Sequence, residues 1–404
     1  MNTFLIDGNN RYSYDDLLHK INTSNAYYPL LKSNSLFDYF SNLILALVSD
    51  QPLTLLDSDL NSRVINGIED KVSVAVTLEK EYFLSIENII EKINISNSKI
   101  TIFTSGTTGQ PKEVIHSVSI LTRSVRVSDY HKNQIWAFAY NPTHMAGLQV
   151  FFQVFENRNT FVNVFNASRT TIYTSIEKYQ ITHISATPTF YRLLLPVERS
   201  YNQVERVTLG GEKSDKKLYD SILQIFPNAR INNIYASTEA GYLFVAKDDY
   251  FQIPESLTDK IKVEEEELLI HKSLLGFSNN FEFSGDYYKT GDLIEWVDKE
   301  NGLFRFKSRK NELINVGGYK VNPDEVENIL LQMGGIEQVV VYGKPNSVLG
   351  NILCADVKVV HNIELSELSI RQYLGGKLQD YKIPRKINFV DSFSLTRTGK
   401  TKRL

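Results

Sequence analysis

Residues 104–112 place the strongest constraint on what this chain can fold into. They follow a short β-branched and aromatic run at 100–103, which predicts a buried strand leading into a loop. Two glycines allow a tight turn that brings backbone N–H groups close to an anion, and hydroxyl side chains add donors. Lys112 supplies a positive charge at the end of the loop. This is a loop suited to a polyphosphate, and its predicted contacts are Thr104, Ser105, Gly106, Thr107, Thr108 and Gly109.

Two other phosphate-binding loops do not fit this spacing. A Walker A loop has Lys directly after its second Gly, whereas Gln110 and Pro111 separate Gly109 from Lys112. The dinucleotide fingerprint needs an earlier glycine, which the pair Gly106 and Gly109 lacks. Taken alone, the stretch also fits a mobile surface loop rich in Ser, Thr and Gly.

Composition predicts two or three globular domains and argues against several function classes. The chain has 404 residues, and 42% of them are hydrophobic, which is enough for ordinary cores. Its 44 basic and 47 acidic residues nearly balance, so a dominant nucleic-acid or anionic-membrane surface is not indicated. The single cysteine, Cys354, excludes a disulfide framework or a cysteine metal cluster within one chain. No signal peptide or membrane span is apparent, so we expect a cytoplasmic protein.

Strand and helix patterns alternate along most of the chain. Apolar residues at helical spacing cover 36–47, and strand-like runs occur at 135–139, 181–185, 206–209 and 230–235. This alternation predicts a large, layered α/β domain over residues 1–308. Farther on, Asn322 can cap a helix that begins at Pro323, and strand, helix and strand patterns follow. We therefore expect residues 309–404 to form a small α+β domain.

Two loops that follow predicted parallel strands are expected at one edge of a sheet, where ligands of open α/β sheets bind. The first contains Gly211 and Glu212. In the second, Tyr235 can stack on adenine, Thr238 can bind a phosphate oxygen, and Glu239 is an oxygen ligand suited to Mg²⁺. Each loop alone also fits an ordinary turn at a strand end.

The motifs together, in this order, resemble the adenylate-forming superfamily: acyl-CoA and aryl-CoA synthetases, peptide-synthetase adenylation domains and luciferases. The resemblance covers most of the chain, roughly from Tyr12 onward. It implies that Asp292 binds the ribose hydroxyls of a nucleotide and that Arg309 is a second contact to the ribose or phosphate. It also implies that His144 is a gate beside the substrate carboxylate.

The resemblance extends into the predicted small domain. Gly317 and Gly318 match a glycine loop that lines a pantetheine tunnel when this mobile domain swings. Lys400 matches a catalytic lysine that bridges the acyl carboxylate and the α-phosphate. A basic tail of this kind is otherwise usually a solvated charge run. The sequence departs from the family pattern at Glu113, Ala236 and Asn311, where the family has Gly, Gly and usually Asp or Lys.

The resemblance implies an AMP-forming acid–thiol ligase that uses ATP and Mg²⁺. A carboxylic acid first forms an acyl-adenylate, with Lys112 and Lys400 neutralising charge, and a phosphopantetheine thiol then displaces AMP. The thiol acceptor is expected to be coenzyme A, with an acyl carrier protein in trans as the alternative. The acid is expected to be a small aryl or medium acyl acid. A non-catalytic acyl- or nucleotide-binding relative, or a luciferase-like oxygenase, remains open at this point.

Overall fold

The computed structural model describes residues 2–56, 74–79, 81–104, 112–212, 214–247, 250–316, 319–346 and 350–394. The chain divides into two compact units. Unit 1 contains Met1–Lys260 and Ile270–Tyr288, and unit 2 contains Ile261–Leu269 and Lys289–Leu404. Within the described residues, no helix is both long and apolar enough to cross a membrane.

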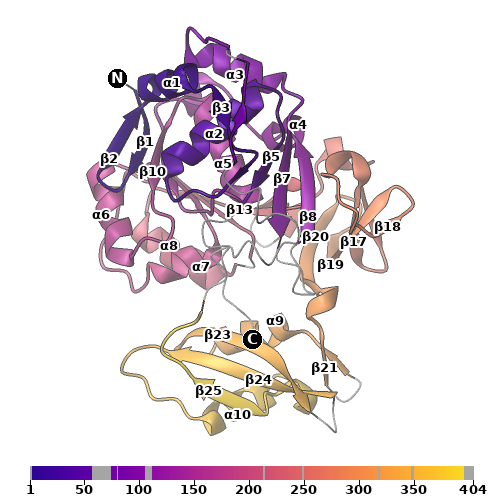
Figure 1. Cartoon of the computed structure of the whole chain (residues 1–404). Helices are drawn as coiled ribbons and strands as arrows, with labels where there is room; N and C mark the ends of the chain where they lie inside the picture. The colour runs from indigo at the N-terminus through magenta and orange to yellow at the C-terminus, as the bar shows by residue number, and fades with distance from the viewer. Residues whose placement is uncertain are drawn as a thin grey trace. The chain divides into compact units, whose positions relative to one another are not determined.

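The main sheet of unit 1 has the strand order β2-β1-β10-β9-β11-β12-β13-β14-β15, and its first three strands lie side by side in Figure 1. From β1 to β13 its neighbouring strands pair in parallel. β2, β14 and β15 extend it by antiparallel pairing. The strands are β1 (Thr3–Asp7), β2 (Asn10–Ser13), β9 (Ile135–Phe138), β10 (Thr160–Asn163), β11 (His183–Ala186), β12 (Arg206–Gly210), β13 (Arg230–Ser237), β14 (Gly241–Lys247) and β15 (Tyr250–Gln252).

Helices cover both faces of this sheet, and the side chains of β9 show this by alternating between two apolar clusters. Trp136 and Phe138 of β9 join one cluster with α1, α2, α3, α4 and α5, and Ala137 joins the other with α6, α7 and α8. The first cluster is rich in stacked rings, such as Phe40 on Phe151, with centroids 4.6 Å apart. The helices are α1 (Tyr14–Thr23), α2 (Leu36–Val48), α3 (Ile86–Asn94), α4 (Val118–Thr122), α5 (Met145–Glu156), α6 (Arg169–Tyr179), α7 (Pro188–Leu193) and α8 (Lys216–Ile225).

A second sheet in unit 1 frames the predicted phosphate loop. Its order is β4-β5-β7-β8, from β4 (Leu30–Leu31), β5 (Leu53–Leu55), β7 (Lys99–Thr104) and β8 (Lys112–Ser117). β7 and β8 form an antiparallel hairpin in which Thr104 pairs with Lys112. The loop at 105–111 therefore starts and ends at paired residues. Smaller pairings join β3 (Ala26–Tyr27) to β6 (Val76–Thr77), and β18 (Phe283–Ser284) to the start of β19.

Unit 2 begins with the strand order β16-β17-β19-β20 and continues into a five-stranded sheet. The first group is β16 (Ile261–Glu264), β17 (Glu267–His271), β19 (Tyr287–Asp298) and β20 (Leu303–Arg309). The second is β21 (Ile314–Val316), β22 (Tyr319–Val321), β23 (Ile336–Asn346), β24 (Gly350–Val359) and β25 (Lys386–Phe389). α9 (Pro323–Leu331) and α10 (Glu367–Gly375) contribute to one apolar cluster with this sheet. Asn322 caps α9 and Pro323 is its first residue, as the sequence predicts.

The layered α/β architecture and the small α+β sheet predicted from the sequence are confirmed. The two compact units divide the chain differently from the predicted domains. The β19–β20 hairpin, which the sequence assigns to residues 1–308, belongs almost entirely to unit 2. The 308/309 boundary stays a prediction about where the small domain pivots.

Candidate active site

The carboxyl ends of β9, β11, β12 and β13 lie at one edge of the main sheet, because these strands pair in parallel in that order. The segments that leave this edge contain five of the predicted site residues: His144 after β9, Gly211 and Glu212 after β12, and Thr238 and the predicted metal ligand Glu239 after β13. This is the edge where open parallel sheets bind ligands.

His144 is the N-cap residue of α5 and is held by its backbone. Its N–H donates to the carbonyl of Asn141 at 3.2 Å, and its own carbonyl accepts the first helical bond from Leu148. The Asn141 side chain in turn accepts from the N–H and hydroxyl of Thr143. Gly147 makes this turn possible, since an added Cβ would lie 2.3 Å from the carbonyl oxygen of Asn141. The half-buried imidazole is thus carried by a fixed turn at the strand edge.

The carboxylate of Glu212 is hydrogen-bonded within the protein. Its two oxygens accept from the N–H and the hydroxyl of Thr189, at 2.9 and 3.0 Å, in the first turn of α7. Gly211 before it has φ +83°, a left-handed conformation that favours glycine. Glu212 therefore ties the β12 loop to α7, and its predicted cofactor contact remains a prediction.

The turn after β13 presents Thr238 and Glu239. The hydroxyl of Ser237 accepts from the N–H of Ala240 at 3.2 Å, and Gly241, with φ +66°, starts β14. Within the described part of the chain, the Glu239 carboxylate makes no hydrogen bond or ion pair. A half-buried carboxylate without a protein partner fits Mg²⁺, which binds one or two carboxylates and completes its shell with substrate phosphates and water.

Tyr235, predicted to stack on adenine, lies in the last part of β13. Its ring stacks on Phe244 of β14, with centroids 5.7 Å apart. A register shift between Tyr235 and Ala236 marks the point where β13 bends before the turn.

Lys112 begins β8 at the end of the phosphate loop. Its side chain is exposed and forms no ion pair with any residue that the structure describes. Thr104 is placed as the last residue of β7. The other predicted loop contacts and the small-domain residues lie outside the described residues; these are Ser105, Gly106, Thr107, Thr108, Gly109, Gly317, Gly318 and Lys400.

In unit 2 the predicted ribose contacts are paired with each other. Nε of Arg309 lies 2.7 Å from a carboxylate oxygen of Asp292, whose side chain is nearly buried, while Arg309 is about half exposed. Gly291, with φ +75°, precedes Asp292, and the N–H of Asp292 donates to the Thr290 hydroxyl. The guanidinium of Arg309 thus holds the Asp292 carboxylate in a fixed orientation.

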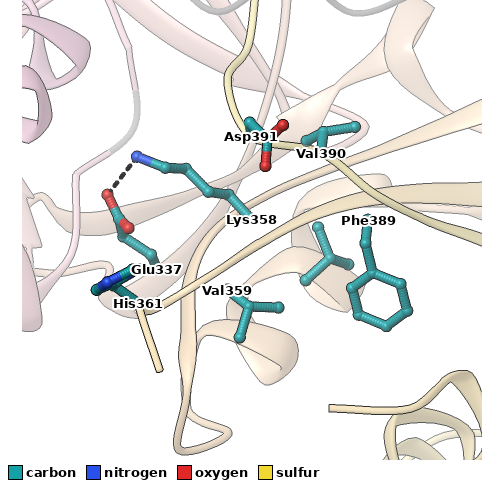
Figure 2. A pocket seen from close by; sticks show the side chains of 8 residues that line it. Glu337, Lys358, Val359, His361, Phe389, Val390 and Asp391 are labelled. Atoms are coloured by element: carbon teal, nitrogen blue, oxygen red, sulfur yellow. Dashed lines mark hydrogen bonds and ion pairs between the residues drawn. The ribbon is translucent and has the colours of Figure 1, made fainter. Parts of the chain in front are cut away.

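Unit 2 also has an open pocket of about 400 Å³ near the end of β25, shown in Figure 2. None of the predicted site residues lines it. A 2.6 Å ion pair between Lys358 and Glu337 lies at its rim. Its lining is Glu337, Val357, Lys358, Val359, His361, Phe389, Val390 and Asp391.

Sequence reasoning missed His116 and Gly276. His116 of β8 is fully buried, and burial lowers the pKa of its imidazole to about 4, opposed by the nearby carbonyl of Thr238. It is therefore neutral at pH 7. Gly276 packs against its ring, because a Cβ there would approach the imidazole to 2.5 Å. The sequence signal that could have identified His116 was a histidine between apolar positions of a strand.

Comparison with known proteins places these features in a family. Residues 53–262 match the family described as AMP-binding enzyme, and residues 325–400 match the AMP-binding enzyme C-terminal domain. A 2-succinylbenzoate–CoA ligase of Staphylococcus aureus (strain JH9) is 27% identical, covering 90% of this chain and 79% of the relative.

Two solved structures of o-succinylbenzoate coenzyme A synthetase from Bacillus subtilis share the fold. One holds the acyl-adenylate intermediate; its TM-score is 0.73 at 19% identity, over 99% of this chain and 94% of that one. The other holds ATP and a magnesium ion; its TM-score is 0.71 at 19% identity, over 99% and 95%.

Proposed function

Because this chain belongs to the AMP-binding enzyme family, we propose that it is an ATP-dependent acid–thiol ligase that joins a carboxylic acid to coenzyme A. The observation that carries the proposal is the pair of unengaged charges in unit 1: the Glu239 carboxylate beyond β13 and the Lys112 ammonium at the end of the phosphate loop. Neither is used by the described part of the protein, and both suit a metal-bound polyphosphate.

In the first half-reaction, a carboxylate oxygen of the acid attacks the α-phosphorus of ATP and pyrophosphate leaves. Glu239 would hold Mg²⁺, and the bound ion would supply neutralisation of charge on the phosphates. Thr238 donates to a phosphate oxygen, and Lys112 and Lys400 balance negative charge that builds during the transfer. Asp292 accepts hydrogen bonds from the ribose hydroxyls, while Arg309 holds that carboxylate in place.

In the second half-reaction, the thiol of coenzyme A attacks the acyl carbon of the acyl-adenylate, and AMP leaves. Gly317 and Gly318 line the path of the pantetheine arm, and His144 controls access beside the acyl carboxylate. A carrier-bound phosphopantetheine is the alternative acceptor, since the attacking thiol group is the same.

For the acid, we propose 2-succinylbenzoate, or another small aryl acid of similar size. Support comes from the activity for which the Staphylococcus aureus relative is named and from the expectation, drawn from the sequence, of a small aryl or medium acyl acid. The relative is 27% identical, so the pocket residues need a direct test.

The test is thioester detection by mass spectrometry. The enzyme receives Mg-ATP, one acid from a panel of 2-succinylbenzoate, benzoate and medium-chain fatty acids, and either coenzyme A or a phosphopantetheinylated carrier protein. We expect 2-succinylbenzoyl-CoA with the wild type and a loss of about 10²- to 10³-fold in rate with Lys400→Ala. A thioester formed only on the carrier would replace the coenzyme A assignment, and no thioester with any acid would contradict the ligase.

A further inference from the structure

Arg123 is hydrogen-bonded to the backbone of the turn at residues 237–241, which carries the predicted phosphate and metal ligands. It follows α4 directly. Its Nη2 donates to the carbonyls of Ala240 and Tyr242, at 2.5 and 3.2 Å, and its Nη1 donates to the carbonyl of Leu274 at 3.1 Å. One guanidinium thus binds carbonyls on both sides of Gly241, where the 237–241 turn enters β14, and a carbonyl of the short 3-10 helix Lys272–Leu274.

A further backbone hydrogen bond holds the same turn, and its acceptor belongs to Glu239 itself. The N–H of Gly276 donates to the Glu239 carbonyl at 2.8 Å. The next residue, Phe277, exchanges two backbone hydrogen bonds of 2.8 Å with Ile115 of β8. The turn that carries Glu239 is therefore attached to β8, the strand that Lys112 begins.

These hydrogen bonds fix the orientation of the backbone carbonyl groups as well as their distance from the donors. A guanidinium has a planar fork of donors, so it orients the carbonyls that it binds more strictly than an ammonium does. Because the Glu239 carboxylate makes no hydrogen bond or ion pair within the described part of the chain, its position depends largely on the backbone of the turn. A shift of about 1 Å in a ligand's position can cost about 10²-fold in rate.

We propose that Arg123 is a positioning residue: with Gly276, it sets the backbone of the 237–241 turn so that Glu239 can hold the metal of Mg-ATP, although Arg123 itself does not touch the nucleotide. The inference rests on the proposed function of Glu239. It extends that function to a residue that no sequence motif singles out.

The test compares Arg123→Met with a matched control, Arg169→Met. Arg169 also uses its guanidinium to bind backbone carbonyls, those of Leu194 and Pro196, and it pairs with Glu198. It begins α6, away from the 237–241 turn in the chain, and has no predicted role at the site. The readout is the dissociation constant for ATP, measured by calorimetry on the full chain with Mg²⁺ and with EDTA.

We expect Arg123→Met to weaken Mg-ATP binding about tenfold or more, while ATP without Mg²⁺ binds as it does to the wild type. Arg169→Met should keep the full gain in affinity from Mg²⁺. Arg123→Lys keeps the charge but not the forked donors, so its affinity for Mg-ATP should lie between those of the wild type and Arg123→Met. It serves as the test if Arg123→Met does not fold. An unchanged Mg²⁺-dependent gain in the folded Arg123 variants would overturn the proposal. Because this readout is binding, it is separate from the thioester assay that tests the ligase activity.

Discussion

Two carboxylates, Glu212 and Glu239, follow neighbouring strands of one sheet, yet their surroundings differ. Glu212 is held by Thr189, whereas Glu239 has no partner in the part of the chain that the structure describes. The sequence could place both at strand ends because each follows a clear apolar strand pattern. It could not separate their roles, because the contact of Glu212 depends on how α7 lies against the β12 loop.

This difference predicts the effect of Glu239→Gln. An amide keeps the shape but loses the charge that Mg²⁺ prefers, so acid-dependent exchange of pyrophosphate into ATP should fall about 10²-fold. The Mg²⁺ concentration for half-maximal exchange should rise. Glu177→Gln is the control, since Glu177 forms an exposed ion pair with Arg199. An unaltered Mg²⁺ requirement in Glu239→Gln would remove Glu239 from the metal site.

At the scale of elements, many strands and helices with clear apolar patterns were predicted, but several were missed, including β14 and α8, whose apolar positions are regular. β7 was predicted from its β-branched run, but its partner β8 was missed. The buried positions of β8 include His116, which breaks the apolar alternation. α6 was also missed, since its Thr and Tyr residues are poor helix formers, and packing of Ile172 and Ile176 stabilises it instead.

The turn between β9 and α5 predicts a specific glycine requirement. Gly147→Ala would place a Cβ 2.3 Å from the Asn141 carbonyl oxygen, so the turn that carries His144 would have to shift. We expect a loss of about 1–3 kcal/mol in the free energy of unfolding, measured with urea. Gly334→Ala is the control, because nothing lies within 4 Å of the added Cβ. Equal stability of the two variants would show that the turn relaxes freely.

At the scale of the whole molecule, the order of motifs along the chain was predictable, and the fold follows it. The division of the chain into compact units was less predictable from the sequence. The turn at 298–302 and the apolar runs beside it predict a hairpin, but a local pattern does not tell which core a hairpin joins. That depends on the pairing of β19 with β17, a strand outside the hairpin.

Acid stability of the whole molecule should depend on His183. It is buried against Trp136, with ring centroids 4.8 Å apart. Burial, together with the nearby charge of Arg206 and His131, lowers the pKa of its imidazole to about 4. The unfolded chain binds the proton near pH 6.5, so this histidine's contribution is complete above pH 6.5 and is lost as the pH falls toward 4.

The loss from this one histidine should reach about 3 kcal/mol at pH 4. Urea unfolding at pH 7 and at pH 4 measures it. His183→Gln should reduce the difference between the two pH values, whereas His361→Gln, at an exposed position, should not. The same pH dependence in the wild type and in His183→Gln would contradict this assignment.

The central claim is that this chain makes an acyl-adenylate. The most direct measurement is the exchange of labelled pyrophosphate into ATP, with 2-succinylbenzoate and Mg²⁺ present and Lys400→Ala as the control. The account predicts incorporation of label that requires both the acid and Mg²⁺ and that falls about 10²- to 10³-fold in the control. ATP that binds but acquires no label with any acid of the panel would contradict it, and a nucleotide-binding protein without ligase activity would be the better description.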